Sequence, residues 1–415
     1  MLLNRCFSVN RIYFFLKEVT FLIDHYKIDP DSNTAFFFIS KKVTEHSCPC
    51  CGNKTKRIHD HRNQIINHSP LNGYFTKLVL KKTRLLCTNC GKKFYMNYNN
   101  IVNPKFRCSN SLFFDIINML KNTSMTFEQV ASFFGVSSGV VTRYLNFFSF
   151  MMNWNCISHL PKHIGIDEFK GNCDGSKYLF HVYDLDTKET VTILKSRKYD
   201  EIVEFFNSIT NRNDVEIVTM DLYDTFRNAV KTKLKKATII ADRFHYTRII
   251  AKALDEIRLE LWRNATNSTE KRYLKNLKLA LLTNVENVDS DKALKILERL
   301  NYAFDLNLTL KSAYELYQSF LRIKDGDTYQ EKVKRLRDWL DDALSSTLTK
   351  FESAANTLIN WNKEVVNSLK YDYTNSATEG KNNKIKVIKR NAYGFRKLVN
   401  LSNLIKIRDL KHVEI

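Results

Sequence analysis

Three carboxylates of this sequence, Asp167, Asp221 and Glu379, stand where they could do chemistry. Asp167 lies in the apolar run at 164–169, and Asp221 follows the apolar run at 215–220. The charge of an aspartate at the end of a buried strand loses its hydration, so a cation or another partner must compensate it. Two such aspartates and a helical glutamate can hold two divalent metal ions, the arrangement that clamps the attacking and leaving oxygens in phosphodiester chemistry.

Each of the three acids also has an ordinary structural explanation. Asp221 would cap the helix that follows it, and Asp167 would pair with a lysine. Glu379 would lie on a solvated helix face with a routine mixture of charges. Each acid alone therefore says little, whereas two strand-terminal aspartates followed by a helical glutamate favour a metal site.

The segment around Glu379 predicts a helix whose acid and bases share one face. Asn383, Lys386 and Arg390 follow Glu379 at offsets of about four, seven and eleven residues, which is helical spacing. The glutamate would hold a metal ion while these side chains bind phosphates of the strand being cut. Both contacts would strengthen as charge develops on the pentacovalent phosphate.

Two further acids and one histidine lie near the same predicted sheet edge. Asp242 ends a predicted strand as Asp221 does, so it is either a metal ligand or a group that orients one. Glu168 adjoins Asp167. His245 would contact a phosphate or the leaving oxygen, or make a structural hydrogen bond. We therefore rank Asp242, His245 and Glu168 behind the three acids, as residues that support them.

Five of the nine cysteines cluster in two short motifs. Cys48 and Cys51 form one C-x-x-C knuckle followed by glycine, and Cys87 and Cys90 form another, which predicts one tetrahedral zinc in a zinc ribbon. The ligands from the first knuckle are less certain than those from the second, because Cys50 could replace Cys48 or Cys51 as a ligand. Three histidines between the knuckles are substitute ligands, or else solvent-exposed or phosphate-facing residues: His59, His61 and His68. The remaining alternative is four reduced structural thiols.

The composition indicates a folded protein that binds a polyanion. The chain has 415 residues, 44% of them hydrophobic, which is enough for more than one packed core. Lys and Arg number 65 against 44 Asp and Glu, and the formal net charge is +21. Without a basic amphipathic helix beside a long apolar segment, nucleic acid is a better match than a membrane. The odd, clustered cysteines favour a reducing cytoplasm over disulfides, and the N-terminal residues match neither a secretion signal nor a membrane span.

Residues 110–153 predict helices joined by a short turn. A helix, a glycine-containing turn and a second helix make a helix-turn-helix, whose second helix would enter a major groove with Ser138, Thr142 and Arg143 outward. An ordinary helical hairpin fits the same apolar pattern. The net charge and the neighbouring zinc motif favour DNA binding.

From residue 163 the apolar period changes from helical to strand-like. Three consecutive strands are followed by helix, strand, helix and strand, which is the order of a ribonuclease-H-like fold with its acids at strand ends on one edge of the sheet. The fold class is therefore multidomain α/β: a ribonuclease-H-like catalytic core with a helical insertion, preceded by a zinc ribbon and a helix-turn-helix. The predicted domains are the zinc ribbon at 1–105, the helix-turn-helix at 106–158 and the first part of the catalytic core at 159–250. The helical insertion at 251–370 and the last core helix at 371–415 follow.

These motifs resemble those of the Asp-Asp-Glu transposases of bacterial insertion sequences, specifically the ISL-three (ISL3) family. The resemblance covers nearly the whole length, and Cys50 departs from it. Four motifs carry it in part: the cysteine knuckles at 48–52 and 87–91, Gly-Ile-Asp-Glu-Phe at 165–169 and Asp-Arg-Phe-His at 242–245. The most specific are two basic runs near the C-terminus, at 378–386 and 389–396.

The resemblance implies a zinc-binding N-terminus and a helix-turn-helix that recognise terminal inverted repeats, and a core that cuts and rejoins DNA. Asp167, Asp221 and Glu379 would take the three catalytic places. We expect two magnesium ions: water first attacks the end of the element, and the freed 3′ hydroxyl then attacks target DNA. A homodimer on paired ends, in the bacterial cytoplasm and at the nucleoid, is the expected form.

Two other functions fit part of the sequence. One is a metal-dependent nuclease or resolvase on the same fold, which would cut DNA without strand transfer. The other is a non-catalytic DNA-binding regulator, which leaves the three acids unexplained. All three proteins would bind DNA with a strongly salt-dependent affinity.

Overall fold

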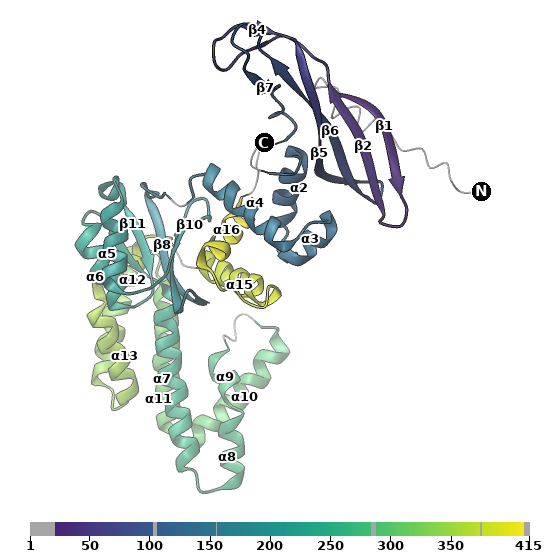
Figure 1. Ribbon diagram of the computed structural model, residues 1–415. Coiled ribbons are helices and arrows are strands. Elements are labelled where there is room, and N and C mark those ends of the chain that lie inside the picture. The colour runs from purple at the N-terminus through teal and green to yellow at the C-terminus, as the bar shows by residue number, and fades with distance from the viewer. Residues whose placement is uncertain (1–20, 103–105, 155, 284–287, 374–375, 411–415) are drawn as a thin grey trace. The chain divides into compact units, whose positions relative to one another are not determined.

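The chain folds into two compact units (Figure 1). One contains residues 1–155 and 388–415, and the other contains residues 156–387. The computed structural model describes residues 21–102, 106–154, 156–283, 288–373 and 376–410, without the side chains of 376–379. The predictions for residues before 21 lie largely outside the described residues. The last predicted domain, 371–415, is shared between the two units.

The first unit is built on a five-stranded sheet with the order β1-β2-β6-β5 and with β7 paired to β6. Neighbouring strands are antiparallel except β2 and β6, which are parallel. The strands are β1 Phe21–Asp29, β2 Thr34–Lys41, β5 Ile58–Leu71, β6 Tyr74–Leu86 and β7 Lys93–Tyr95. Alternate residues point to one face and form a core that includes Phe37, Ile39, Ile66, Leu78 and Leu80. The three histidines between the cysteine knuckles, His59, His61 and His68, all lie on strand β5.

Three helices follow this sheet, and a fourth returns from the C-terminus: α2 Asn110–Leu120, α3 Phe127–Phe134, α4 Ser138–Met151 and α16 Leu398–Asp409. Thr126 and Gln129 form a capping box at the start of α3, and Gly135 ends it at φ +64°. Ser137 occupies the N-cap position of α4, as predicted, but its side chain makes no capping hydrogen bond.

Polar side chains of α16 attach it to the first unit. Asn403 accepts a hydrogen bond of 2.8 Å from Ser149, and Arg408 donates one of 3.1 Å to the carbonyl of Leu120. Both α16 side chains are buried. Because buried polar groups must be paired, these contacts fix where the helix packs.

The second unit contains a five-stranded sheet in the order β10-β9-β8-β11-β12. The first three strands in this order are antiparallel, and β8, β11 and β12 are parallel. The strands are β8 His163–Cys173, β9 Ser176–Asp184, β10 Thr190–Leu194, β11 Ile217–Met220 and β12 Thr238–Ala241. Helices α5 Tyr199–Ser208 and α6 Asp224–Lys233 lie in the connections from β10 to β11 and from β11 to β12, with a short 3-10 turn, η1 Arg212–Asp214, after α5.

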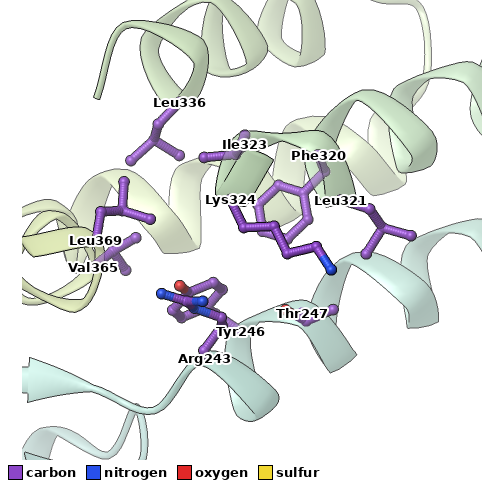
Figure 2. Close-up of a pocket in the computed structure, with 10 residues that line it drawn as sticks. All are labelled: Arg243, Tyr246, Thr247, Phe320, Leu321, Ile323, Lys324, Leu336, Val365 and Leu369. Carbon is purple, nitrogen blue, oxygen red and sulfur yellow. The ribbon is translucent and has the colours of Figure 1, made fainter. Parts of the chain in front are cut away.

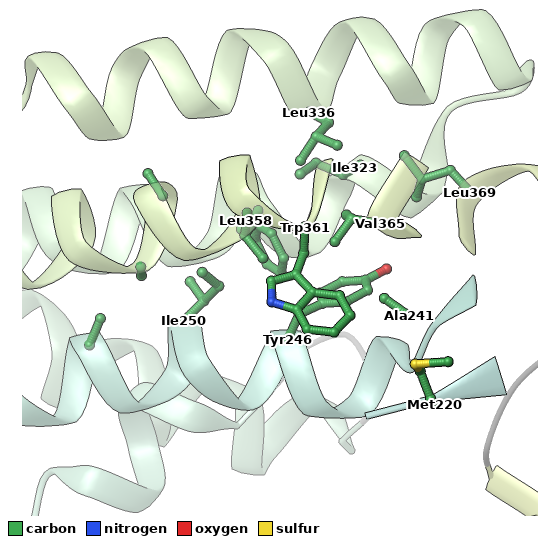
Figure 3. Packing of buried hydrophobic residues seen from close by; sticks show 14 of the residues in the cluster. Met220, Ala241, Tyr246, Ile250, Ile323, Leu336, Leu358, Trp361, Val365 and Leu369 are labelled. Atoms are coloured by element: carbon green, nitrogen blue, oxygen red, sulfur yellow. The ribbon is translucent and has the colours of Figure 1, made fainter. Parts of the chain in front are cut away.

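The remaining elements of this unit are helical, as the sequence predicts: α7 Arg243–Asn264, α8 Ser268–Lys275, α9 Lys278–Leu282, α10 Ser290–Leu306, α11 Leu308–Leu321, η3 Arg322–Asp325, α12 Tyr329–Ser345, α13 Thr349–Asn360, α14 Asn362–Lys370 and α15 Ser376–Asn391. Most of them share one hydrophobic cluster with the sheet, where the sequence predicted a separate core. Figure 3 shows Trp361 and Val365 beside Met220 and Ala241 from the ends of two strands. None of the described helices is both long and apolar enough to cross a membrane.

Candidate active site

Strand register places three aspartates at one edge of the second unit's sheet. Thr219 pairs with Gly165 in the parallel β8–β11 ladder, and Met220 pairs with Ala241 in the β11–β12 ladder. Continuing both registers aligns Asp221 with Asp167 on one side and with Asp242 on the other. We call these three residues the acid row.

Asp167 differs in one respect from its prediction. It lies inside β8, which continues to Cys173 as a hairpin with β9, whereas β11 stops at Met220. The aspartate thus sits where its parallel neighbour ends. The sequence could not show this, because strand length here depends on pairing with β9.

Burial raises the pKa values of two members of the acid row, and the charges of its neighbours add to the shift at Asp221. Asp167 is 9% exposed, and desolvation raises its pKa to about 6, although the backbone N–H of Glu168 opposes the shift. Desolvation and then the charges of Asp167 and Asp242 raise the pKa of Asp221 to about 8. Asp167 and Asp242 are therefore close enough to Asp221 to disfavour its ionisation.

Neither ordinary explanation for these two aspartates fits the structure. Helix α6 is capped by Tyr223, so Asp221 is not its N-cap. No lysine or arginine among the described residues forms an ion pair with Asp167. The Oδ1 atom of Asp221 is buried and accepts no hydrogen bond within the described part of the chain.

Asp242 and His245 lie in the first turn of α7 and complete a potential metal-binding group with Asp221. Ligand atoms of these three residues lie within 4.8 Å of one another. His245 Nε2 is 3.2 Å from Asp221 Oδ1 and 3.8 Å from Asp242 Oδ2. Asp242 is 6% exposed and also caps α7 by accepting a hydrogen bond from the N–H of Phe244. The structure thus brings Asp242 closer to the site than the supporting role that the sequence predicted.

Helix α15 contacts the acid row through Asn382, a residue that the sequence analysis missed. The Asn382 side chain is 8% exposed and donates a hydrogen bond to Asp167 Oδ2. Its Oδ1 is buried and has no donor among the described residues. Its position three residues after Glu379, on the same helical face, was the available signal.

The Glu379 side chain lies outside the described residues, although position 379 belongs to α15. The proximity of the Glu379 carboxylate to the aspartates of the acid row therefore stays a prediction. Asn383, Lys386 and Arg390 are exposed on α15, and Lys386 donates a hydrogen bond of 3.3 Å to Asn383.

The Glu168 side chain contacts Arg197 and not the acid row. Its carboxylate forms an ion pair with Arg197 at 2.5 Å, and the Arg197 guanidinium stacks on Tyr178 at 4.3 Å. The backbone N–H of Glu168 donates a hydrogen bond of 2.6 Å to Asp167 Oδ1. Glu168 therefore supports Asp167 through its main chain.

A tyrosine lies across β8 on the face that carries Asp167. Tyr183 pairs with Gly165 in the β8–β9 ladder, and its hydroxyl is 3.5 Å from the Thr219 hydroxyl on β11. A Cβ at Gly165 would lie 1.8 Å from the Tyr183 ring, so only glycine leaves room for this crossing.

A small cavity of about 200 Å³ lies beside the first turns of α7 (Figure 2). It is lined by Arg243, Tyr246, Thr247, Phe320, Leu321, Ile323, Lys324, Leu336, Val365 and Leu369. Arg243 is anchored there by a hydrogen bond of 2.9 Å to the carbonyl of Ser368.

The four predicted zinc ligands come together in the first unit. Ligand atoms of Cys48, Cys51, Cys87 and Cys90 all lie within 4.8 Å of one another. The Sγ atoms of Cys48 and Cys90 are 3.6 Å apart. Those of Cys51 and Cys87 are 3.5 Å apart. Four thiols in this arrangement fit one tetrahedral zinc.

Two equivalent turns build this cysteine cluster. Gly52 and Gly91 have φ values of +72° and +70°, and each N–H donates a hydrogen bond of 3.0 Å to the carbonyl of the first cysteine of its knuckle. The N–H groups of Cys90 and Asn89 lower the pKa of Cys87 to about 6, which favours the thiolate that binds metal. Cys50 is exposed and lies outside the cluster. The three predicted substitute histidines also lie outside it: His59 and His61 are exposed, and His68 is buried.

Two of the three residues that were predicted to face outward from the proposed recognition helix α4 are only partly exposed to solvent. Ser138 and Thr142 are half-buried, and Arg143 is exposed. Ser138 and Thr142 line a cavity of about 470 Å³ together with the turn between α15 and α16, including Phe395 and Arg396.

Comparison with known proteins gives matches to two families that together span most of the chain. Residues 164–405 match a family described as a transposase, that of the ISL3 group, and residues 44–90 match the zinc-finger of transposases IS204, IS1001, IS1096 and IS1165. The transposase for insertion sequence element IS1001 from Bordetella parapertussis is 22% identical over 84% of this chain and 85% of its own. An ATP-dependent protease from Lactococcus lactis subsp. lactis is 35% identical over 101 residues, 24% of this chain and 30% of its own. The sequence contains no G-x-x-x-x-G-K-[ST] phosphate loop.

A zinc ribbon joined to a transposase domain defines the class: this is a DNA transposase. The transposase match covers more than half of the chain. The chain belongs to the ISL3 family of insertion-sequence transposases.

Proposed function

We propose that this transposase binds the terminal inverted repeats of its insertion sequence and catalyses metal-dependent DNA cleavage and strand transfer at the acid row. The observation that carries the proposal is the register of β8, β11 and β12, which aligns Asp167, Asp221 and Asp242 at one sheet edge. No packing requirement explains three neighbouring acids of which two, Asp167 and Asp242, are buried and the third, Asp221, is half-buried.

The acid row fits a divalent cation. Carboxylates are the ligands that magnesium prefers, and a cation would offset the desolvation that raises the pKa values of Asp167 and Asp221 and the repulsion that adds to the shift at Asp221. We propose that Asp167, Asp221 and Glu379 hold two magnesium ions, with Asp242 as a fourth acid at the site. Magnesium bound there would activate the attacking oxygen and stabilise the leaving 3′ oxygen.

Other residues would orient these acids and the DNA. Asn382 holds the Asp167 carboxylate in one rotamer through its amide, and His245 lies close enough to Asp221 to fix that carboxylate when protonated. The exposed Asn383, Lys386 and Arg390 would bind phosphates of the strand being cut.

The proposed reaction consists of two in-line displacements. In the first, a water oxygen bonds to the phosphorus at the element's end and loses its proton, while the bond from phosphorus to the 3′ oxygen breaks and that oxygen takes up a proton. In the second, the 3′ hydroxyl oxygen bonds to a target phosphorus and loses its proton. The target's own 3′ oxygen leaves and is protonated. Neither step needs a covalent enzyme intermediate.

The fold supports finer assignments within this proposal. Three antiparallel strands, with two parallel strands added beside the first, support a ribonuclease-H-like core. Helices α3 and α4, joined through the left-handed Gly135, support a helix-turn-helix. We propose that Ser138, Thr142 and Arg143 of α4 contact the repeat, and that a homodimer at the nucleoid holds two paired ends.

The test uses a donor plasmid that carries the DNA flanking the gene, a target plasmid and magnesium. Asp167→Asn, Asp221→Asn and Glu379→Gln should abolish cleavage while end binding persists in a gel-shift assay. Glu204→Gln, at an exposed acid of α5, is the matched control and should cut normally. Robust cutting by any folded acid variant would refute the catalytic assignment. Cleavage without joined products would indicate a nuclease or resolvase instead.

A further inference from the structure

The turn between α15 and α16 presents a tyrosine that neither packing nor backbone preference explains. Tyr393 is 100% exposed, so its ring gains nothing from burial in the fold. Its φ is +51°, in the left-handed region that side chains other than glycine seldom adopt.

Hydrogen bonds show why this position is unfavourable for tyrosine. The N–H of Gly394 donates to the carbonyl of Lys389 at 2.9 Å, and the N–H of Tyr393 donates to the carbonyl of Arg390 at 3.1 Å. This pair of bonds is the Schellman motif that ends many helices, and its left-handed position is usually glycine. Here tyrosine occupies that position and glycine follows it. A strained residue kept without a packing benefit points to a contact outside the fold.

The surroundings of Tyr393 indicate what that contact is. Arg390, Arg396 and Lys397 are exposed within four residues of it. Phe395 anchors the turn edge-on against Phe127 of α3, with ring centroids 6.1 Å apart. The result is an exposed aromatic ring held in place among cations.

We propose that Tyr393 stacks on an unpaired or unstacked base of the bound DNA, while the cations of the turn bind the flanking phosphates. Aromatic rings stack on any base, because every base has a π-face, and basic side chains follow the backbone without reading sequence. The inference deepens the proposed DNA recognition and rests on DNA binding, but it does not depend on the catalytic role of the acid row.

The experiment measures binding of the full-length protein without added magnesium to two duplexes. They differ only in that one carries an unpaired 2-aminopurine, whose fluorescence falls when it stacks on a tyrosine. Tyr393→Gly removes the ring and also relieves the left-handed backbone, so its melting temperature should not fall. It should bind the duplex with the unpaired base about tenfold more weakly and lose the quenching.

Three comparisons make the result decisive. Tyr393→Phe should keep both affinity and quenching, because it keeps the ring. Tyr302→Ala, at an exposed tyrosine of α10, should behave as the unaltered protein. Affinity for the fully paired duplex should change less than twofold in all variants. Equal loss on both duplexes, or loss on neither, would overturn the stacking assignment. Because no cleavage is measured, failure here is distinct from failure of the proposed catalysis.

Discussion

The two candidate metal sites of this protein are built in opposite ways. The cysteine cluster comes from two equivalent turns, each of which supplies its own two ligands. The acid row comes from three strands and becomes a site only through their pairing register. The comparison shows that the candidate structural metal site is encoded locally, whereas the proposed catalytic site depends on the fold around it.

Removing one ligand should therefore have opposite effects on stability at the two sites. At the cysteine cluster the metal holds the fold together. At the acid row the fold holds repelling charges together. Four measurements test this contrast.

The largest effect is expected for Cys87→Ser. A structural zinc site contributes on the order of 10 kcal/mol of apparent binding free energy, so losing one thiolate should release zinc and unfold both knuckles. Zinc content by atomic absorption and protease sensitivity of the first unit would report this. Cys50→Ser should retain zinc, because that thiol is exposed and outside the cluster. Full zinc retention by Cys87→Ser would contradict the assignment.

Asp221→Asn should abolish cleavage and yet stabilise the protein when magnesium is absent. The substitution removes a buried charge beside Asp167 and Asp242, and one pKa unit corresponds to about 1.4 kcal/mol. A gain of at least about 1 kcal/mol near pH 8 is expected in urea unfolding. A loss of stability would mean that the acids do not repel one another.

The pH dependence of stability should also differ in sign between the sites. The pKa of Asp221 is raised from 3.8 to about 8, so the folded protein keeps a proton that the unfolded chain releases. This contribution is fully present below the unfolded pKa and is lost as pH rises through about 8, at up to about 1.4 kcal/mol per pH unit. The zinc site should instead weaken as pH falls, because protons compete for its thiolates.

Melting temperatures from about pH 5 to about pH 9, compared between the unaltered protein and Asp221→Asn, would isolate the carboxyl contribution. Magnesium should raise the melting temperature of the unaltered protein most at the alkaline end. Parallel curves for the two proteins would remove the basis for this prediction.

The smallest effect is expected for Asn382→Ala, which removes the donor to Asp167 Oδ2 but no proposed metal ligand. Loss of such an orienting hydrogen bond typically costs about 10- to 100-fold in metal affinity or activity. Magnesium titration of the cleavage rate would show whether the metal requirement rises. Asn356→Ala, at an exposed position of α13, is the control for loss of a helical amide. Equal effects of the two substitutions would argue against a specific role for Asn382.

The sequence predicted the locally encoded features well. All four cysteines of the cluster were identified by spacing, and the order from residue 163 of three strands followed by helix, strand, helix and strand is the one predicted. The role of Cys50 stayed open, because three cysteines in four residues all satisfy the same local pattern. Only the folded knuckle shows which two point inward.

Features that depend on distant pairing were predicted less well. Asn382 was missed because its partner Asp167 lies 215 residues away in the chain. Ser138 and Thr142 were predicted to point outward, but they line a cavity with a C-terminal turn that helical periodicity cannot reveal. The separate core expected for the helical insertion is instead shared with the sheet, since apolar periodicity identifies a buried face but not its partner.

The glycine at position 165 gives this protein a vulnerability at a residue that itself carries no reactive group. One added methyl group there would collide with the Tyr183 ring and push its hydroxyl away from Thr219, two residues before Asp221. Strand β9 would then lose its contact with β11, the strand that ends just before Asp221. A copy of this insertion sequence could thus be silenced by a mutation that leaves every acid, cysteine and basic residue intact.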